Sequence, residues 1–312
     1  IMLRWRLLLG TFFVAALVGL IWLDKLSHPP GLWLLPLAIL LGLAATGELL
    51  SMLRDLQMRP QAWLVCAGNA LIMLAAWLPF AFGRVDAQHN QQLPSAMDSS
   101  ILALSWAALA MVAAMAALWL AEMVRYRKPG GTTGNLAGGV LGLAYIGLPL
   151  ALLVQLRMLW GLGALVATVA VVKMGDTGAY VFGHLIGRHK LAPLISPKKT
   201  VEGLIGHMLA AALTGWLVFE YLVPLLTPET AAPAASASSG QWGAGWRAVL
   251  FGLFVGAAGL AGDLAESLLK RDCGRKDSSR WLPGLGGVLD MLDSLLLAAP
   301  AAWLCCAVKL VG

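Results

Sequence analysis

Residues 248–293 read AVLFGLFVGAAGLAGDLAESLLKRDCGRKDSSRWLPGLGGVLDMLD, and this stretch decides how the chain folds. It begins with an apolar run close to the roughly 20 residues that a bilayer-spanning helix needs. The run leads directly into a cluster of acidic and basic side chains that begins at Asp263 and ends at Asp293. An ionisable group near a bilayer is costly unless it faces a polar cavity, a partner or a metal ion. The cluster therefore indicates a functional site.

Similar apolar runs recur along the whole chain. Hydrophobic residues make up 59% of the sequence and charged residues 12%, with a mean hydropathy of +0.79, which excludes an ordinary soluble domain. We expect an all-α, polytopic integral membrane protein with about nine transmembrane helices. It should form one continuous membrane domain, with N-terminal helices in 1–130 and a catalytic region in 131–312. The apolar runs cover residues 7–23, 31–50, 61–82, 101–121, 136–154, 158–174, 204–224, 248–264 and 293–311.

The basic residues predict the orientation of these helices. If each run crosses once and Arg4 and Arg6 lie in the cytoplasm, most other Lys and Arg residues fall on the cytoplasmic side too. This excess explains the net charge of +6, so we expect membrane lipids and no nucleic acid as partners. We expect a multi-pass protein of the cell membrane, with the bacterial inner membrane favoured and the active site facing the cytoplasm. The first run could be a signal peptide, but it continues to Trp22 without an obvious cleavage site, which favours an uncleaved helix.

Polar residues are sparse in the first half of the chain. Glu48 and Asn69 lie inside apolar runs. Each could line a cavity, but a buried hydrogen bond between helices is the favoured interpretation. We predict no chemical function for either.

The first cytoplasmic segment that carries chemistry contains Asp176, Lys198 and Lys199. The two lysines immediately precede an apolar run, so they should lie at the start of a helix, where backbone N–H groups and the helix dipole favour an anion. A polyphosphate would be held there. The lysines could instead only anchor the helix at anionic lipid. That alternative does not account for Asp176, Ser196 and Thr200 beside them.

The second segment is the charged cluster itself. If the helix continues past the membrane, Asp263, either Glu266 or Ser267, and Lys270 recur at three to four residues and share one face. A simpler explanation is an i,i+4 pair of Glu266 and Lys270 on a solvated face. We expect that arrangement for Glu266, but not for Asp263, which ends an apolar run where an unpaired carboxylate is expensive.

Asp290 lies where the chain returns to the membrane after a glycine-rich turn. Asp263 and Asp290 should therefore come from neighbouring helices at similar depth. Paired carboxylates suggest Mg²⁺, which takes one or two carboxylates together with phosphate oxygens, and the nearby lysines suggest a nucleoside triphosphate. No nucleophile–base pair is evident. A phosphomonoester, with a second pKa of roughly 6, needs none, because positioning and charge neutralisation suffice for its attack on an α-phosphate.

These residues carry a family resemblance. The second segment, Ser267-x2-Lys270-Arg271-x4-Lys276-Asp277 followed by Pro283-Gly-Leu-Gly-Gly287-x2-Asp290-x2-Asp293, resembles the signature of the phosphatidate cytidylyltransferases, also called CDP-diacylglycerol synthases. The stretches Asp176-Thr-Gly-Ala-Tyr180 and Ser196-Pro-Lys-Lys-Thr200 resemble another motif of that family. The resemblance covers about 173–206 and 262–295, called here the first and second signature segments.

The resemblance implies that CTP and phosphatidic acid give CDP-diacylglycerol and pyrophosphate with Mg²⁺. It also implies a homodimer of helical protomers, with nucleotide and lipid headgroup meeting in a membrane-embedded cavity on the cytoplasmic side. Carried over residue by residue, the metal ligands would be Asp263 and Asp290. Substrate phosphates would be contacted by Ser267, Lys270 and Arg271, with Lys276 and Asp277 shaping the same pocket. CTP would be bound with the help of Asp176, Lys198 and Lys199.

Two positions depart from the family pattern. Leu285 stands where the family usually has His, and Met291 where it usually has Arg. Because the carboxylates and lysines remain, we favour a working enzyme. A catalytically impaired paralogue and a transferase for another lipid phosphate stay open. A transporter ranks below these, because transporter sites tend to lie midway along broken helices between related halves.

Overall fold

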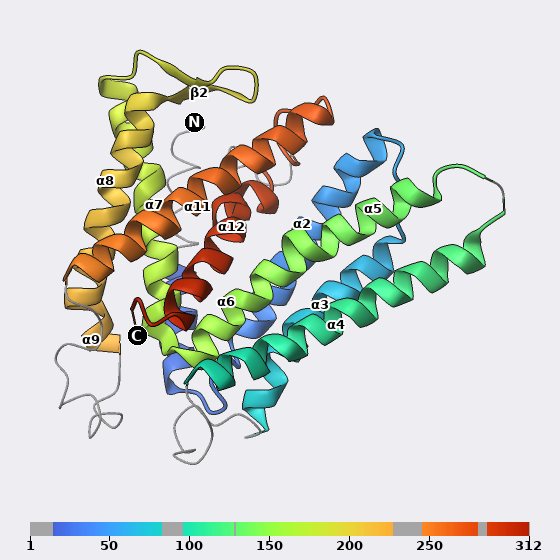
Figure 1. The fold of residues 1–312 in the computed structure, drawn as a ribbon, viewed down its shortest axis with the longest axis horizontal. Helices are drawn as coiled ribbons and strands as arrows, with labels where there is room; N and C mark the ends of the chain where they lie inside the picture. The colour runs from blue at the N-terminus through green and yellow to red at the C-terminus, as the bar shows by residue number, and fades with distance from the viewer. Residues whose placement is uncertain (1–14, 83–95, 128, 227–244, 280–285, 312) are drawn as a thin grey trace. The chain divides into compact units, whose positions relative to one another are not determined.

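The computed structural model describes residues 15–82, 96–127, 129–226, 245–279 and 286–311 (Figure 1). Within these residues, eight helical segments are long and apolar enough to cross a membrane. They correspond one to one with the predicted runs from the second to the last, so the prediction of an all-α polytopic membrane protein is confirmed. The run 7–23 begins outside the described residues, and residues 15–26 are helical. The candidate spans are Leu34–Asp55, Ala62–Ala81, Ser100–Arg125, Thr132–Leu159, Gly161–Leu185, Val201–Leu226, Gly245–Asp272 and Val288–Ala307.

The chain divides into two compact units, and each is discontinuous in sequence. The first unit comprises Ile1–Met158 and Lys270–Leu292, and the second comprises Leu159–Leu269 and Asp293–Gly312. The boundary thus passes through both helices of the second signature segment. The expected single membrane domain, with its regions 1–130 and 131–312, stays a prediction.

The first unit contains the N-terminal helices. These are α2 (Leu34–Asp55), α3 (Ala62–Ala81), α4 (Ala96–Arg125), α5 (Thr132–Gly142), the π-helix η1 (Leu143–Gly147) and α6 (Leu148–Leu159). Asn69 of α3 is fully buried, and its Nδ2 donates to Thr46 Oγ1 of α2 at 2.7 Å. The same Nδ2 also donates to the Gly142 carbonyl oxygen at 3.4 Å. The predicted interhelical hydrogen bond is therefore confirmed for Asn69, where a buried amide without a partner would be costly.

The second unit is assembled through glycines. Its helical elements are α7 (Gly161–Leu185), α8 (Val201–Leu217), η2 (Val218–Leu222), α9 (Val223–Leu226), most of α11 (Gly245–Asp272) and most of α12 (Val288–Ala307). A Cβ added at Gly178 of α7 would lie 2.5 Å from the Gly206 carbonyl oxygen of α8. Gly252 of α11 approaches the backbone of Ala211 of α8 just as closely. Small residues let helix backbones meet in a bilayer, so α8 contacts both α7 and α11.

A two-stranded antiparallel hairpin connects α7 to α8 (Figure 1). Its strands are β1 (Lys190–Ala192) and β2 (Ser196–Thr200). Thr200 caps α8, because its Oγ1 accepts a hydrogen bond from the Gly203 backbone N–H at 3.1 Å. Lys198 and Lys199 thus precede the helix as predicted, although they lie in an extended strand.

Candidate active site

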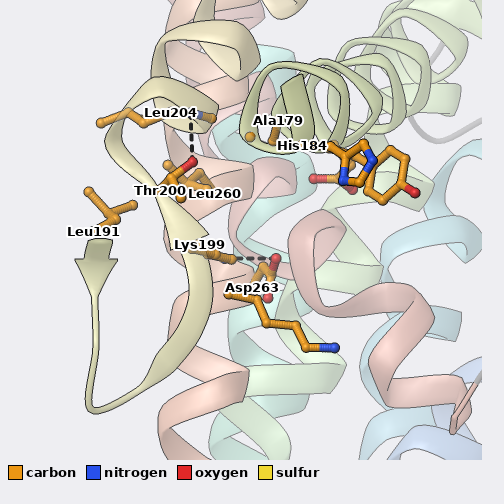
Figure 2. A pocket seen from close by; sticks show the side chains of 13 residues that line it. Ala179, His184, Leu191, Lys199, Thr200, Leu204, Leu260 and Asp263 are labelled. Carbon is orange, nitrogen blue, oxygen red and sulfur yellow. Dashed lines mark hydrogen bonds and ion pairs between the residues drawn. The ribbon is translucent and has the colours of Figure 1, made fainter. Parts of the chain in front are cut away.

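A pocket of about 350 Å³ lies in the second unit and brings the two signature segments together. Its lining includes Asp176 from α7, Lys198 and Lys199 from β2, and Asp263 from α11 (Figure 2). These are four of the residues that the sequence predicted for the site. The volume lies at the lower end of the roughly 300–1,000 Å³ typical of small-molecule sites.

The closest charged contact in this pocket joins β2 to α11. Lys199 Nζ lies 2.7 Å from Asp263 Oδ2, with the two side chains 18% and 29% exposed (Figure 2). One helical turn further on, Ser267 Oγ donates to Asp263 Oδ1 at 3.4 Å. The helix α11 continues unbroken to Asp272, so the predicted three-to-four-residue spacing that ends at Lys270 is realised on a helix.

Asp176 lies near a buried histidine that the sequence analysis missed. His207 of α8 is fully buried, and its Nδ1 lies 3.9 Å from Asp176 Oδ1. Its Nε2 lies 2.9 Å from the Gly256 carbonyl oxygen. Because a carbonyl only accepts, Nε2 carries a hydrogen and Nδ1 is the nitrogen that faces the carboxylate. The sequence did offer a signal for His207, because it is an ionisable residue inside the apolar run 204–224.

Asp293 is a second residue missed by the sequence analysis as a site candidate. Its side chain is buried, and its charge and that of Asp263 interact. Gly262 of α11 packs directly against the Asp293 backbone of α12, which explains the proximity. The electrostatic interaction of Asp263 extends to Asp176 as well. The second unit therefore holds three carboxylates whose charges interact through Asp263, and two of them, Asp176 and Asp263, line the pocket.

These carboxylates are hard oxygen donors of the kind that Mg²⁺ prefers. Among the described residues, no group of three or more His, Cys, Asp or Glu side chains is arranged to hold a metal ion. Since Mg²⁺ usually takes only one or two carboxylates and completes its shell with water and phosphate, a pair such as Asp263 and Asp293 still fits it.

Asp290 belongs to the first unit and has different surroundings. Its Oδ1 accepts from Lys270 Nζ at 2.6 Å. Its Oδ2 accepts from the Ser278 N–H at 3.0 Å, Ser278 Oγ at 2.7 Å and the Gly287 N–H at 2.8 Å. The bond from the Gly287 N–H to Asp290, the third residue of α12, is one half of a capping box; Gly287 has no side chain to make the other half. Because Asp263 belongs to the other unit, the predicted metal pair of Asp263 and Asp290 stays a prediction.

The remaining predicted residues of the second signature segment follow α11. Arg271, Lys276 and Asp277 are exposed, and Arg271 Nη1 donates to the Arg275 carbonyl oxygen at 3.3 Å. Their roles toward substrate stay predictions. The prediction that Glu266 lies on a solvated face is wrong, since its side chain is fully buried. Of the two departures from the family pattern, Met291 lies in α12 and Leu285 lies outside the described residues.

Comparison of the sequence with known proteins identifies its family. The model of the cytidylyltransferase family matches residues 4–309. The Staphylococcus haemolyticus phosphatidate cytidylyltransferase is 31% identical over 271 residues, covering 86% of this chain and 88% of that protein. The uncharacterized Escherichia coli protein YnbB is 30% identical over 230 residues, covering 73% of this chain and 60% of that protein.

Other relatives match over a shorter stretch. The Staphylococcus saprophyticus phosphatidate cytidylyltransferase is 35% identical over 161 residues, covering 52% of this chain and 55% of that protein. In matches of this kind the chain spans about half the length of the curated relatives. The family match nevertheless extends over nearly the whole chain, and the chain belongs to the cytidylyltransferase family.

Proposed function

We propose that this protein transfers the cytidylyl group of CTP to phosphatidic acid and releases CDP-diacylglycerol and pyrophosphate. The observation that carries the proposal is the pocket in which Lys198 and Lys199 of the first signature segment meet Asp263 of the second, beside Asp176. Ammonium groups suit a polyphosphate, and the carboxylates suit its counter-cation. The names of the Staphylococcus relatives give the same reaction.

The bond changes balance without an added base. A phosphate oxygen of phosphatidic acid attacks the α-phosphorus of CTP and forms a new P–O bond. The bond from the α-phosphorus to the oxygen that bridges to the β-phosphate breaks, and pyrophosphate leaves with that electron pair. The attacking phosphate is already largely dianionic near neutral pH, since its second pKa is roughly 6.

The chain's own contribution is then positioning and charge neutralisation. Lys198 and Lys199 would hold the β- and γ-phosphates and offset the charge that develops on the leaving pyrophosphate. Lys199 forms an ion pair with Asp263 at 2.7 Å, so a nucleotide phosphate would share this ammonium with the carboxylate. Arg271 and Lys270 are proposed to contact the lipid phosphate.

We propose Mg²⁺ as the cofactor, with Asp263 as one ligand. When bound, Mg²⁺ would withdraw charge from the phosphate oxygens of the reacting nucleotide. Asp290 is the second ligand that the family resemblance implies. The contacts favour Asp293 instead, because protein donors occupy both oxygens of Asp290, whereas the two donors of Ser294 both reach Asp293 Oδ1. The charge of Asp293 also interacts with that of Asp263.

The proposed setting is a cell membrane, with the bacterial inner membrane favoured and the pocket open to the cytoplasm. The bias of Lys and Arg residues toward one side supports this orientation. CTP would enter from the cytosol, and phosphatidic acid from the bilayer. A homodimer is proposed from the family resemblance.

The test is a transfer assay with purified full-length protein in lipid, given labelled CTP, phosphatidic acid and Mg²⁺. Equal amounts of CDP-diacylglycerol and pyrophosphate are expected. An inactive wild type that gains activity when Leu285→His and Met291→Arg are combined would establish an impaired paralogue instead. Turnover with another lipid phosphate alone would change the substrate, and solute flux without pyrophosphate release would favour a transporter.

A further inference from the structure

Glu48 of α2 makes far more contacts than the single interhelical hydrogen bond expected from the sequence. Its Oε1 accepts from Ser279 Oγ at 2.8 Å and from the Val288 N–H at 2.9 Å. Its Oε2 accepts from Ser278 Oγ at 2.8 Å and from the Leu289 N–H at 2.9 Å. All of these residues belong to the first unit, and all four donors lie in the second signature segment.

Two of the donors are backbone groups at the start of a helix. Val288 and Leu289 open α12, and the first N–H groups of a helix have no partner within it. A carboxylate is also favoured there by the positive end of the helix dipole. Together with Asp290, which takes the Gly287 N–H, Glu48 satisfies three successive amides. The glutamate therefore fixes where α12 begins.

The other two donors lead to the candidate site residues. Ser278 is almost fully buried, and its Oγ lies 2.8 Å from Glu48 Oε2 and 2.7 Å from Asp290 Oδ2. Asp290 in turn holds Lys270 Nζ at 2.6 Å. Gly287 adjoins this hydroxyl so closely that an added Cβ would overlap both Ser278 Oγ and the Glu48 carboxylate. A continuous set of contacts thus runs from Glu48 to Lys270.

A second tie holds the same part of the chain to α2. Arg275 Nε contacts Asp55 Oδ2 at 2.5 Å, and its Nη1 and Nη2 donate to Ser51 Oγ at 2.7 Å and Ser51 O at 3.2 Å. Glu48, Ser51 and Asp55 recur at three and four residues and so share one face of α2. This face is called here the anchoring face.

We propose that Glu48 is a positioning residue for cytidylyl transfer, acting through Ser278 and the start of α12 to orient Asp290 and Lys270. Four protein donor groups already converge on its two oxygens, and one of them, Ser278 Oγ, shares its single hydrogen between Glu48 and Asp290. Glu48 therefore acts indirectly and is not itself a ligand of the substrate. The inference rests on the proposed function. It adds an N-terminal helix, for which the sequence indicated no chemistry, to the machinery of that reaction.

The main test compares Glu48→Gln with Glu122→Gln in the full-length protein. The first change replaces one acceptor oxygen by an NH₂ group that faces two donors. Glu122 is the control, because it is also a carboxylate of the first unit that accepts a side-chain hydrogen bond, from Asn135 Nδ2 at 3.4 Å; it is buried, whereas Glu48 is half-buried. We expect Glu48→Gln to lower kcat by roughly 100-fold, as small displacements of reacting groups do, with KM for CTP changed less than about threefold. Glu122→Gln should keep kcat within about twofold.

Ser278→Ala provides a second variant, because it cuts the link to Asp290 while Glu48 keeps both α12 amides. This variant tests the same role of Glu48 if Glu48→Gln does not fold. If Glu48 acts through Ser278, the double variant should lose little more kcat than Glu48→Gln alone. Fully additive losses, or a wild-type kcat in Ser278→Ala, would overturn the inference.

Cys273 gives a readout that does not depend on catalysis. It lies half-buried just after α11, and burial together with Asp272 and Asp55 raises the pKa of its thiol. In a protein whose other cysteines are replaced by Ala, Glu48→Gln should speed maleimide alkylation of Cys273 several-fold, since the segment loses its hold on α2. Glu122→Gln should leave the rate unchanged.

The two proposals fail in different ways. A wild type that transfers no cytidylyl group to any lipid phosphate overturns the proposed function and, with it, the catalytic role of Glu48. An active wild type with unchanged kcat and unchanged Cys273 alkylation in Glu48→Gln overturns the inference alone. A faster alkylation with unchanged kcat also overturns it, because Glu48 would then anchor the segment without serving the reaction.

Discussion

Asp263 and Asp290 stand on successive helices of one signature segment, yet their surroundings differ. Asp263 lines a pocket, is 29% exposed and contacts one ammonium and one hydroxyl group. Asp290 is 14% exposed and is surrounded by four donor groups of Lys270, Ser278 and Gly287, of which the Ser278 hydroxyl is shared with Glu48. A carboxylate with unused lone pairs suits a ligand, whereas one saturated by protein donors holds a helix start in place. Two aspartates of the same motif therefore have different roles, Asp263 toward a ligand and Asp290 toward the helix start.

The largest effect that follows from this difference is expected for Asp263→Asn. The amide keeps the shape but removes the charge in the pocket, so transfer should fall by at least about 1,000-fold while the thermal midpoint stays within a few degrees. The assay measures CDP-diacylglycerol formation across a Mg²⁺ titration, with circular dichroism melting as the control. Wild-type turnover in this variant would remove Asp263 from the site.

Asp290→Asn should act first on stability. Its Lys270 partner is only 11% exposed, and loss of a charge-assisted hydrogen bond to such a group costs about 2 kcal/mol. We expect a lower thermal midpoint with a partial loss of activity. An unaltered thermal midpoint with abolished transfer would instead support Asp290 as a metal ligand. Asp293→Asn, measured alongside, decides whether Asp290 or Asp293 is the second ligand beside Asp263.

Lys199→Ala tests the pocket from the nucleotide side. Removing the ammonium should raise KM for CTP by about tenfold, because one charged hydrogen bond to phosphate is lost. Lys198→Ala is the matched variant on the neighbouring residue. Since Lys199 contacts Asp263 at 2.7 Å, its replacement should also lower kcat, whereas a KM effect alone would separate the lysine from the reacting centre.

The smallest effect is expected at the helix cap behind the lysines. Thr200→Ala removes the side-chain acceptor of the Gly203 N–H and should cost about 1 kcal/mol of stability. Thr200→Ser keeps the acceptor and should restore the thermal midpoint. If Thr200→Ala has the thermal midpoint of the wild type, the Thr200 cap does not contribute to stability.

The helices were predictable because hydropathy is a local property, and runs such as 31–50 and 248–264 extend into α2 and α11. Lys198, Lys199 and Asp263 were predictable as site residues because each adjoins an apolar run, and the pocket contains all three. The hairpin was not, since strands of three and five residues are too short to show alternation.

The sequence alone could not show which carboxylate of α12 lies near Asp263. Asp290 and Asp293 both lie near the start of α12, and nothing local says which one meets Asp263. Within the second unit, the close packing of Gly262 on the Asp293 backbone brings Asp293 near Asp263, and that is a tertiary contact. The expectation for Glu266 was wrong for a related reason, because its burial depends on what packs against α11 and not on its spacing from Lys270. The partners of Glu48 lie more than two hundred positions away, beyond the reach of any local pattern.

Gly252 has a consequence that reaches beyond its own surroundings. It lies three helical turns before Asp263 on α11, and its missing side chain lets that helix touch α8, whose first turn follows Lys199. A methyl group there would wedge the two helices apart and lengthen the distance between an ammonium and a carboxylate that it never touches. In a saturation screen for enzyme activity, this uncharged position should therefore tolerate as little variation as the ion pair itself.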